Sequence, residues 1–243
     1  MSVAYREHAP SPLLAPYVEC FWSIEAGAVI AEYPVLPDGC ADIVFAPRTA
    51  PGLRLVGTMT EARRFTLAPG DFQMGVRFRP GMAASFIKLP GSESTDRMIP
   101  LSDVWGAAAK QLENQIVEAA SAERAIAVLE AQLVDPAEPG TVQQIAAYVV
   151  ETNGQVRVDD LAFSAGMSAR QLRRLFVEQI GLSPKHFCRV IRFRNSVAQL
   201  SDKGRGDWTQ VALDCGYYDQ AHFINEFREL SGYTPSEFAS RPR

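Results

Sequence analysis

The C-terminal part of the chain contains one pattern twice. The segment "LAFSAGMSARQLRRLFVEQIGLSPKHF" begins at Leu161, and "VALDCGYYDQAHFINEFRELSGYTPSEF" begins at Val211. Each copy predicts a short helix, a tight glycine turn and a second helix. The copies match at a spacing of 50 residues and, after one additional residue in the second copy, of 51: Ala162 and Ala212, Gly166 and Gly216, Phe176 and Phe227, Gly181 and Gly232, Pro184 and Pro235, Phe187 and Phe238.

The residues around each turn have the properties that this arrangement needs. Alanine before the turn lets two helices approach closely, and glycine adopts the backbone conformation of a tight turn without a steric penalty. Ser168, with Gln171 three residues later, predicts a capping box at the start of the second helix. Asp219 predicts the N-cap of the equivalent helix in the second copy. The sequence thus indicates where both second helices begin.

The second helix of the first copy is predicted to be basic on its outer face. Its apolar residues face inward, which leaves three arginines outward: Arg170, Arg173 and Arg174. Guanidinium groups bind guanine O6 and N7 and also bind phosphate oxygens. Residues 165–205 carry nine Lys and Arg against two acidic residues, although the whole chain has a net charge of -4. These features predict double-stranded DNA as the partner, the other interpretation of the charge being a solvated helix face.

The equivalent helix of the second copy is polar rather than basic. Its outward positions are predicted to be Gln220, Ala221, His222 and Asn225. Side-chain amides pair bidentately with adenine, and an alanine contacts a thymine methyl group. We therefore expect the first copy to bind mainly through charge and the second copy to discriminate between bases.

Between the copies, "PKHFCRVIRFRNSVAQL" predicts a long connecting helix. A rigid connector places both copies on one face of DNA, in successive major grooves ~34 Å apart. Four basic residues of this helix are predicted either to contact phosphates or to remain solvated, and the spacing leaves both interpretations open: Lys185, Arg189, Arg192 and Arg194.

These motifs resemble the DNA-binding domain of AraC-type (AraC/XylS) transcription regulators. The resemblance covers about residues 141–240 and rests on "GLSPKHF" and "GYTPSEF", which close the two copies, and on "ALDCGYYDQAHFINEFRE". It implies an all-α domain of seven helices, placed at residues 139–243, whose two second helices enter adjacent major grooves. The base-contacting positions of the family fall on the seven outward residues of the two copies. One departure is Trp208, which stands where an aliphatic residue is usual and implies a larger core with unchanged contacts.

Residues 1–100 have a different character and predict a β-rich domain. Short apolar or alternating runs such as "CFWSI", "ADIVF", "LRLVG" and "FQMGVRFR" are separated by Pro and Gly residues. Through "APYVECFWS", "LPDGCADIVF", "GVRFRPG" and "IPLSDVWG" this part resembles a small β-rich N-terminal domain found on some AraC-type regulators, which implies sensing or dimerisation. We expect a cupin-like or small-barrel fold that binds a small-molecule effector.

Residues 101–138 predict a helical hairpin that links the two parts. "SDVWGAAAKQLENQIVEAA" carries an apolar stripe, a second short helix follows, and "DPAEPG" reads as a linker. The stripe consists of Val104, Trp105, Ala108, Leu112 and Ile116. We expect the hairpin to serve dimerisation and the protein to be a homodimer. The whole chain thus predicts an α+β multidomain protein.

A candidate effector pocket surrounds "VLPDGCADIVF" in the β-rich part. The segment 37–39 predicts a turn, and Cys40 lies between this turn and the strand that follows. Arg77 and Arg79 alternate along a strand, so that both would face one side and could hold a carboxylate. Salt bridges to acidic residues of this domain are the other interpretation. The candidate residues are Trp22, Asp38, Cys40, Asp42, Arg77 and Arg79.

Two other functions need chemistry that the sequence supports less well. A thiol enzyme with Cys40 as its nucleophile lacks a convincing base, because His8 is the only histidine before residue 186. A fusion of a DNA-repair protein and a regulator, with a zinc-bound acceptor cysteine, requires about four Cys or His ligands. Only Cys20 and Cys40 lie in the N-terminal part. We expect no catalytic residue, metal or cofactor, and reduced cysteines that are buried one by one.

The longest apolar runs span only a few residues, so we expect no membrane helix. The start "MSVAYREHAPSP" lacks the basic and then apolar pattern of a secretory signal. We therefore expect a cytoplasmic, one-component, effector-responsive transcription regulator that binds specific DNA sequences, with RNA polymerase as a further partner.

Overall fold

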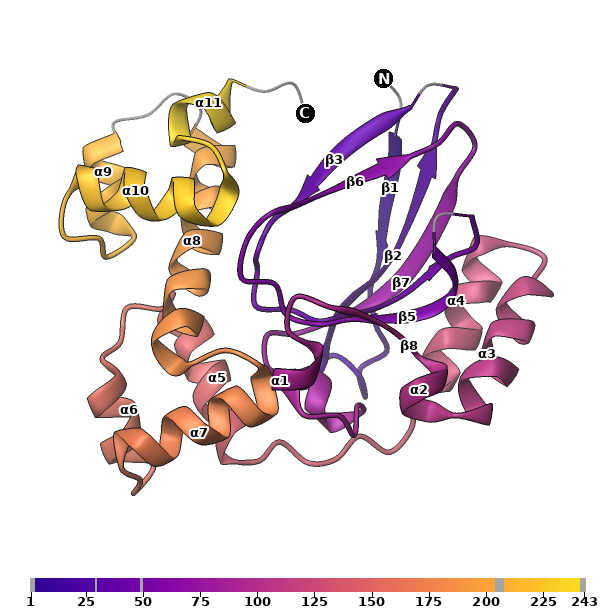
Figure 1. Ribbon diagram of the computed structural model, residues 1–243, viewed down its shortest axis with the longest axis horizontal. Helices are drawn as coiled ribbons and strands as arrows, with labels where there is room; N and C mark the ends of the chain where they lie inside the picture. Colours follow the sequence, from indigo (N-terminus) through magenta and orange to yellow (C-terminus); the bar gives the residue numbers. More distant parts are fainter. Residues whose placement is uncertain (1–2, 29, 49, 204–207, 241–243) are drawn as a thin grey trace.

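The computed structural model describes residues 3–28, 30–48, 50–203 and 208–240. The β-rich part was correctly predicted, and the four quoted runs correspond to β2, β4, β5 and β7 (Figure 1). The described strands are β1 (Val3–His8), β2 (Val18–Ala26), β3 (Ala31–Val35), β4 (Asp42–Ala46), β5 (Ala50–Val56), β6 (Arg63–Leu67), β7 (Phe72–Phe78) and β8 (Met98–Pro100).

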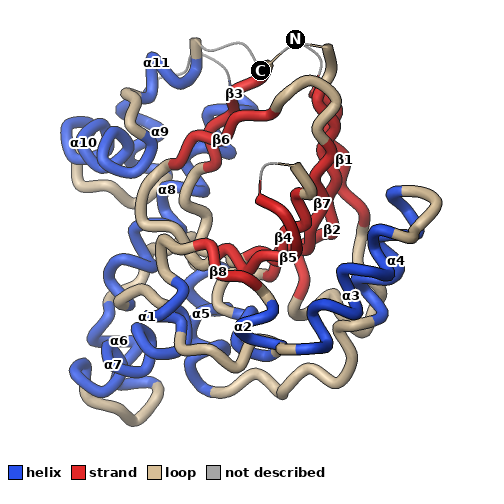
Figure 2. The backbone as a smooth tube through the Cα atoms, turned by 45° about the vertical axis from the view of Figure 1, so that its right-hand side comes forward, coloured by secondary structure: helices blue, strands red, loops and turns tan. Residues whose placement is uncertain are grey.

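The described strands form two sheets. Six of them make an antiparallel sheet in the order β1-β2-β7-β4-β5-β8, and β3 pairs with β6 in a separate ribbon. Figure 2 shows this ribbon raised away from the larger sheet. In the larger sheet Arg77 of β7 lies opposite Cys20 of β2 on one side and Asp42 of β4 on the other. The strand register therefore brings residues of the predicted effector pocket side by side.

The hairpin predicted for residues 101–138 consists of α2 (Ser102–Trp105), α3 (Ala107–Val117) and α4 (Ala122–Ala131). Gly106, with a φ of 59°, interrupts the first predicted helix. The interruption shifts the apolar stripe, so that Ala109 is buried whereas Ala108 is exposed. The apolar residues of α3 and α4 share one core with the larger sheet. The apolar side of the hairpin is thus covered by the protein's own strands, and dimerisation through the hairpin stays a prediction.

The helical C-terminal part was also correctly predicted. Its described helices are α5 (Thr141–Glu151), α6 (Val158–Ser164), α7 (Ala169–Ile180), α8 (Pro184–Lys203), α9 (Trp208–Asp214), α10 (Gln220–Ser231) and α11 (Pro235–Ala239). α8 runs between the two helix pairs, α6–α7 and α9–α10, as the connecting segment predicted (Figure 1). Fully buried phenylalanines fill the core that these helices share: Phe176, Phe187, Phe193, Phe223 and Phe227.

The β-rich part contacts both helix pairs. The short helix α1 (Gly91–Ser94) packs on the C-terminal end of α7, and the Thr58 hydroxyl donates a 3.1 Å hydrogen bond to the carbonyl of Ile180. At the other pair, the backbone N–H of Ala62 donates to the carbonyl of Leu230 at 2.9 Å. Residues 1–100 therefore bridge the two ends of the helical part.

Candidate nucleic-acid interface

The turn between α6 and α7 has the predicted geometry. Gly166 adopts a left-handed φ of 63°. The side chains of Ser168 and Gln171 form the predicted capping box at the start of α7. Because this box fixes the first residue of the helix, it also fixes which residues face outward. All three predicted contact residues of α7 are exposed: Arg170, Arg173 and Arg174.

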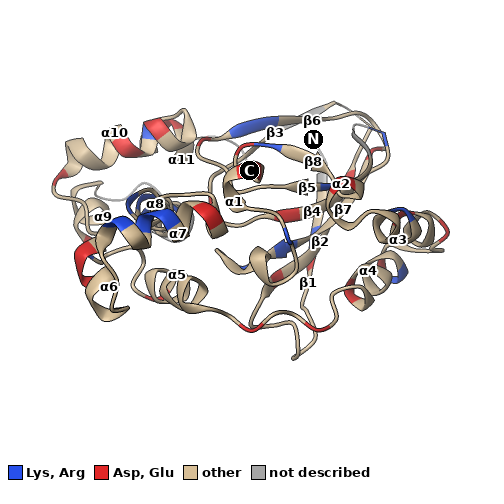
Figure 3. Ribbon diagram, turned by 60° about the horizontal axis from the view of Figure 1, so that its bottom comes forward, with Lys and Arg blue, Asp and Glu red and all other residues tan. Residues whose placement is uncertain are grey.

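The outer face of α7 presents positive charge to solvent. Arg174 lies 3.5 Å from Glu178, and both side chains are more than half exposed. An exposed pair of this kind contributes little to stability, so a stronger anionic partner can replace it. Figure 3 shows basic positions gathered on α7 and α8, whereas α10 carries acidic ones. The arginines of α7 are thus placed to bind phosphate oxygens or guanine edges.

The second helix pair repeats the turn but not the charge. Gly216 has a left-handed φ of 76°, and the Asp219 side chain caps α10 by accepting a 2.7 Å hydrogen bond from the backbone N–H of His222. The predicted outward residues Ala221, His222 and Asn225 are exposed, and Gln220 is partly exposed. The face therefore offers amide, methyl and imidazole groups, which suit contacts with base edges.

Two arginines of α8, for which the sequence left open phosphate contact or solvation, are engaged by carboxylates inside the protein. Arg189 forms 2.7 Å ion pairs with Glu226 and with Glu229. Arg192 lies 3.5 Å from Glu226. Carboxylates thus compensate both guanidinium groups within the protein, so neither is simply solvated, and phosphate contacts stay a prediction. Lys185, at the start of α8, is exposed as expected.

Glu226 is a residue of this interface that we did not predict. Only 6% of its side chain is exposed, and it joins α10 to two arginines of α8. Its carboxylate also lies 3.7 Å from Nε2 of His222, one turn earlier on α10. The spacing of four residues from His222, and of three residues between Arg189 and Arg192, was visible in the sequence. Spacing within each helix does not show which helices face each other, so the pairing was not predictable.

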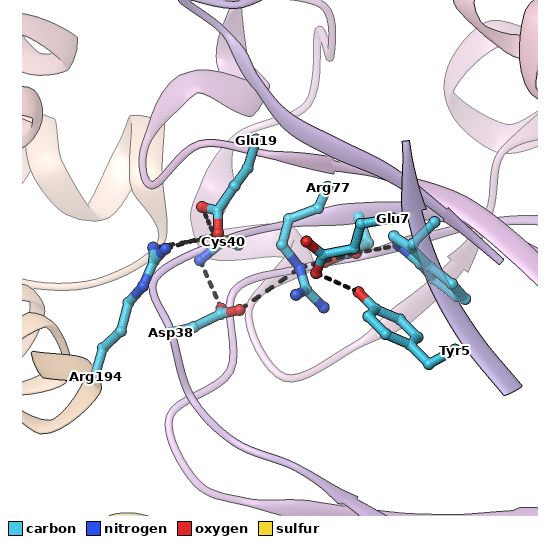
Figure 4. A network of polar contacts seen from close by, with 9 residues as sticks. Tyr5, Glu7, Glu19, Asp38, Cys40, Arg77 and Arg194 are labelled. Atoms are coloured by element: carbon cyan, nitrogen blue, oxygen red, sulfur yellow. Dashed lines mark hydrogen bonds and ion pairs between the residues drawn. The ribbon is translucent and has the colours of Figure 1, made fainter. Parts of the chain in front are cut away.

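Five of the six residues predicted for the effector pocket are joined by hydrogen bonds and ion pairs, and Figure 4 shows three of them, Asp38, Cys40 and Arg77. The Trp22 indole donates a 2.9 Å hydrogen bond to Asp42. Nε of Arg77 lies 3.4 Å from Asp42 and 3.7 Å from Asp38. The backbone N–H of Cys40 donates to Asp38 at 2.9 Å, which closes the predicted turn. Arg77 therefore forms the salt bridges of the second interpretation.

Arg79 lies apart from this cluster. It follows the last residue of β7, is exposed, and donates a 2.7 Å hydrogen bond from Nε to the carbonyl of Ala15. The pair of arginines expected to hold a carboxylate is not formed, because the strand ends before Arg79 and because acidic residues already compensate Arg77.

Cys40 is buried where the β-rich part meets α8. Its Sγ lies 3.7 Å from Glu19 and 3.9 Å from Arg194, which form a 2.7 Å ion pair with each other. Burial, assisted by the charges of Asp38 and Glu19, raises the pKa of the Cys40 thiol well above its ordinary value. A raised pKa disfavours the thiolate that nucleophilic catalysis requires. Arg194, which we also predicted to contact phosphate, instead joins α8 to the β-rich part.

The other expected chemistry concerns metals, disulfides and membranes. None of the four cysteines forms a disulfide, and all four are buried: Cys20, Cys40, Cys188 and Cys215. Among the residues that the structure describes, no three His, Cys, Asp or Glu side chains are grouped so as to hold a metal ion. Within the same ranges, every helix is too short or too polar to cross a membrane.

A groove of about 390 Å³ lies at the boundary between the β-rich part and the first helix pair. Its walls come from parts of the segments 84–90 and 137–140 and from α5 and α7. Gln143 and Gln179, which line it, are joined by a 3.1 Å hydrogen bond. The residues that we predicted for the effector pocket do not line this groove.

The carboxyl group of Asp42 should make stability depend on pH. Burial raises its pKa from 3.8 to about 6, against the lowering effect of Arg77. Between these two values the folded protein binds more protons than the unfolded chain, so the free energy of unfolding should rise as the pH falls from about 6 to about 4. Urea unfolding at several pH values should show this rise in the wild type relative to Asp42→Asn. Equal pH dependence in both proteins would contradict the expectation.

Two families of domains match this chain. Residues 161–241 match a helix-turn-helix domain, and residues 6–100 match a domain of unknown function (DUF6597). An uncharacterized HTH-type transcriptional regulator of Haemophilus influenzae is 29% identical over 94 residues, which are 39% of this chain and 31% of that protein. The HTH-type transcriptional regulator MtrA of Neisseria gonorrhoeae is 33% identical over 81 residues, 33% of this chain and 27% of its own.

The chain therefore spans about a third of the length of the curated relatives it matches. Among solved structures, a probable AraC family transcriptional regulator from Rhodopseudomonas palustris has 28% sequence identity and a TM-score of 0.38, and the alignment covers 42% of this chain and 98% of that one. Residues 161–241 therefore match a helix-turn-helix domain, similar in sequence to HTH-type transcriptional regulators, and they follow residues that match a domain family of unknown function.

Proposed function

We propose that this protein is a sequence-specific DNA-binding transcription regulator whose helices α7 and α10 enter successive major grooves. The observation that supports this best is the repeated helix pair itself. Both second helices begin at a side-chain cap, and both turn their predicted contact residues to solvent. The connecting helix α8 contacts both α7 and α10, which supports an arrangement suited to two neighbouring grooves.

The two helices would have different roles in DNA binding. α7 would anchor the protein through Arg170, Arg173 and Arg174, which bind phosphates or guanines. α10 would test the sequence through the amide groups of Gln220 and Asn225. The helix-turn-helix match of residues 161–241 and the similarity to HTH-type transcriptional regulators support the proposal.

Replacing Arg173 by Ala should weaken DNA binding by about 1–3 kcal/mol. If the guanidinium neutralises a phosphate, the slope of log affinity against log salt should also become shallower by about 0.9. Asn225→Ala should instead change the preferred base at one or two positions and leave the slope unchanged. The measurement is fluorescence anisotropy on a duplex that the wild type selects from a random pool, repeated at several salt concentrations.

A matched control for this experiment is Arg124→Ala, which removes the same charge from an exposed position on α4. Its DNA affinity should equal that of the wild type. If Arg173→Ala binds as tightly as Arg124→Ala at fixed salt, α7 is not the anchoring helix.

We further propose that residues 1–100 respond to a small-molecule effector and pass the signal to the helical part. The Glu19–Arg194 ion pair supports this, because it connects the cluster around Cys40 to α8, which carries both DNA-reading helices. A regulator of this kind would act in the cytoplasm. That the protein forms a homodimer and that it contacts RNA polymerase stay predictions.

Thermal-shift screening of metabolites would find a ligand of residues 1–100. A ligand that stabilises the protein without changing its DNA affinity would argue against effector control.

A further inference from the structure

The turn that precedes α10 contains one residue more than the turn that precedes α7. In the first helix pair only Met167 stands between Gly166 and the cap residue. In the second pair Tyr217 and Tyr218 stand between Gly216 and Asp219. Tyr217 is buried, with 3% of its surface exposed, and takes the place of Met167 against the core. Tyr218 is the additional residue, and 88% of its surface is exposed.

The backbone of this turn is fixed, so the exposure of Tyr218 does not arise from a loose loop. The N–H of Tyr217 donates a 2.9 Å hydrogen bond to the carbonyl of Ala212, and the N–H of Tyr218 donates to Nδ1 of His222 at 3.4 Å. The Gln155 side chain braces the turn by donating a 3.0 Å hydrogen bond to the carbonyl of Asp214. A rigid turn thus presents the Tyr218 ring beside the first residues of α10.

Among the residues that the structure describes, the outward positions at the start of α10 lack the arginines that line the outer face of α7. The outward positions of α10 carry amide, methyl and imidazole groups, and its one arginine, Arg228, lies in the last turn. Arg189 and Arg192 of α8 are engaged by Glu226 of α10. An approach to phosphates on this side therefore requires an uncharged hydrogen-bond donor. A phenol hydroxyl is such a donor and is used for phosphate contacts in protein–DNA complexes.

We infer that Tyr218 is a DNA contact of the second helix pair, with its hydroxyl donating a hydrogen bond to a phosphate oxygen beside the groove that α10 enters. The inference rests on the proposed function and adds a contact residue to it. Tyr218 lies directly before the cap residue Asp219 and two residues before Gln220, the first outward residue of α10. A phosphate held there would fix the depth and angle at which α10 approaches the bases.

The test uses the full-length chain and the duplex that the wild type selects from a random pool. Tyr218→Phe keeps the ring and removes only the hydroxyl, so its effect reports the hydrogen bond. Its affinity should fall about tenfold, as for the loss of one hydrogen bond to a charged group. The slope of log affinity against log salt should stay at the wild-type value, because no charge is lost. The control Tyr148→Phe removes a hydroxyl from a tyrosine of α5 that is 51% exposed and should bind as the wild type does.

Each result of this experiment decides the question. Weaker binding by Tyr218→Phe with an unchanged salt slope supports the contact. If Tyr218→Phe binds DNA with wild-type affinity, the phosphate contact is overturned and the proposed function is left intact. The same conclusion follows if Tyr148→Phe loses as much DNA affinity as Tyr218→Phe. Failure of the wild type to enrich any duplex overturns the proposed function and this contact together.

Discussion

Replacing Glu226 by Gln should lower the free energy of unfolding of the helical part by roughly 3 kcal/mol. The carboxylate is 94% buried, since 6% of the side chain is exposed, and it pairs with Arg189 at 2.7 Å and with Arg192 at 3.5 Å. Glutamine keeps the shape but removes the charge, so Arg192 loses its carboxylate partner and Arg189 keeps only the exposed Glu229. Breaking such a pair by changing one partner is costly because the remaining charge stays desolvated.

The chain supplies a matched control for this change. Glu229 pairs with the same Arg189 at the same distance of 2.7 Å, but 64% of its side chain is exposed. Glu229→Gln should therefore cost about 0–1 kcal/mol. Urea unfolding measures both variants, and DNA affinity should fall only in Glu226→Gln, whose α10 loses its buried ion pairs with α8. Equal stability of the two variants would mean that burial of Glu226 does not strengthen its ion pairs.

Replacing Gly91 by Ala should separate the β-rich part from the first helix pair. A Cβ atom at this position would lie 2.4 Å from the backbone nitrogen of Gly181 and 2.6 Å from the carbonyl carbon of Ile180. Backbone atoms cannot rotate away as a side chain can, so the two surfaces must move apart. Overpacking of this kind costs about 1–3 kcal/mol. Hydrogen exchange should become faster at α1 and at the C-terminal end of α7, while the two cores stay protected.

Gly140→Ala is a suitable comparison, because the nearest atom to its new Cβ is the Gln143 amide oxygen at 3.2 Å, at the flexible end of a side chain. It should leave exchange at α7 unchanged. In the proposed function, Gly91→Ala should also remove any effect of an effector on DNA binding while sparing basal binding. Unchanged exchange at α7 in Gly91→Ala would show that the contact between α1 and α7 does not hold the two parts together.

The local elements of the helical part could be predicted because their signals lie within a few residues of one another. The capping box of Ser168 and Gln171 and the cap residue Asp219 fix the starts of α7 and α10. The outward faces of both helices then follow from helical periodicity. The four strands could be predicted from the apolar and alternating runs for the same reason, because alternation along a strand is a local property of the sequence.

Long-range pairing could not be predicted from the sequence. Arg194 pairs with Glu19, which lies 175 residues earlier, and Arg189 pairs with Glu226, 37 residues later. Basic residues on a helix look alike in sequence whether they meet phosphates or acidic side chains, because the choice depends on which elements pack together. The helix break at Gly106 was not predicted for a related reason. The apolar residues before and after Gly106 pack on the same core, so their spacing in the sequence resembles that of one continuous helix.

The uneven distribution of charge between the two helix pairs has a consequence for the time course of binding. Long-range attraction speeds the arrival of a protein at DNA, whereas short-range contacts determine how long the complex lasts. We expect the arginines of α7 to govern the rate of association and its dependence on salt. The uncharged groups before and along α10 should govern the lifetime of the complex, so a correct operator would be distinguished mainly by slow release.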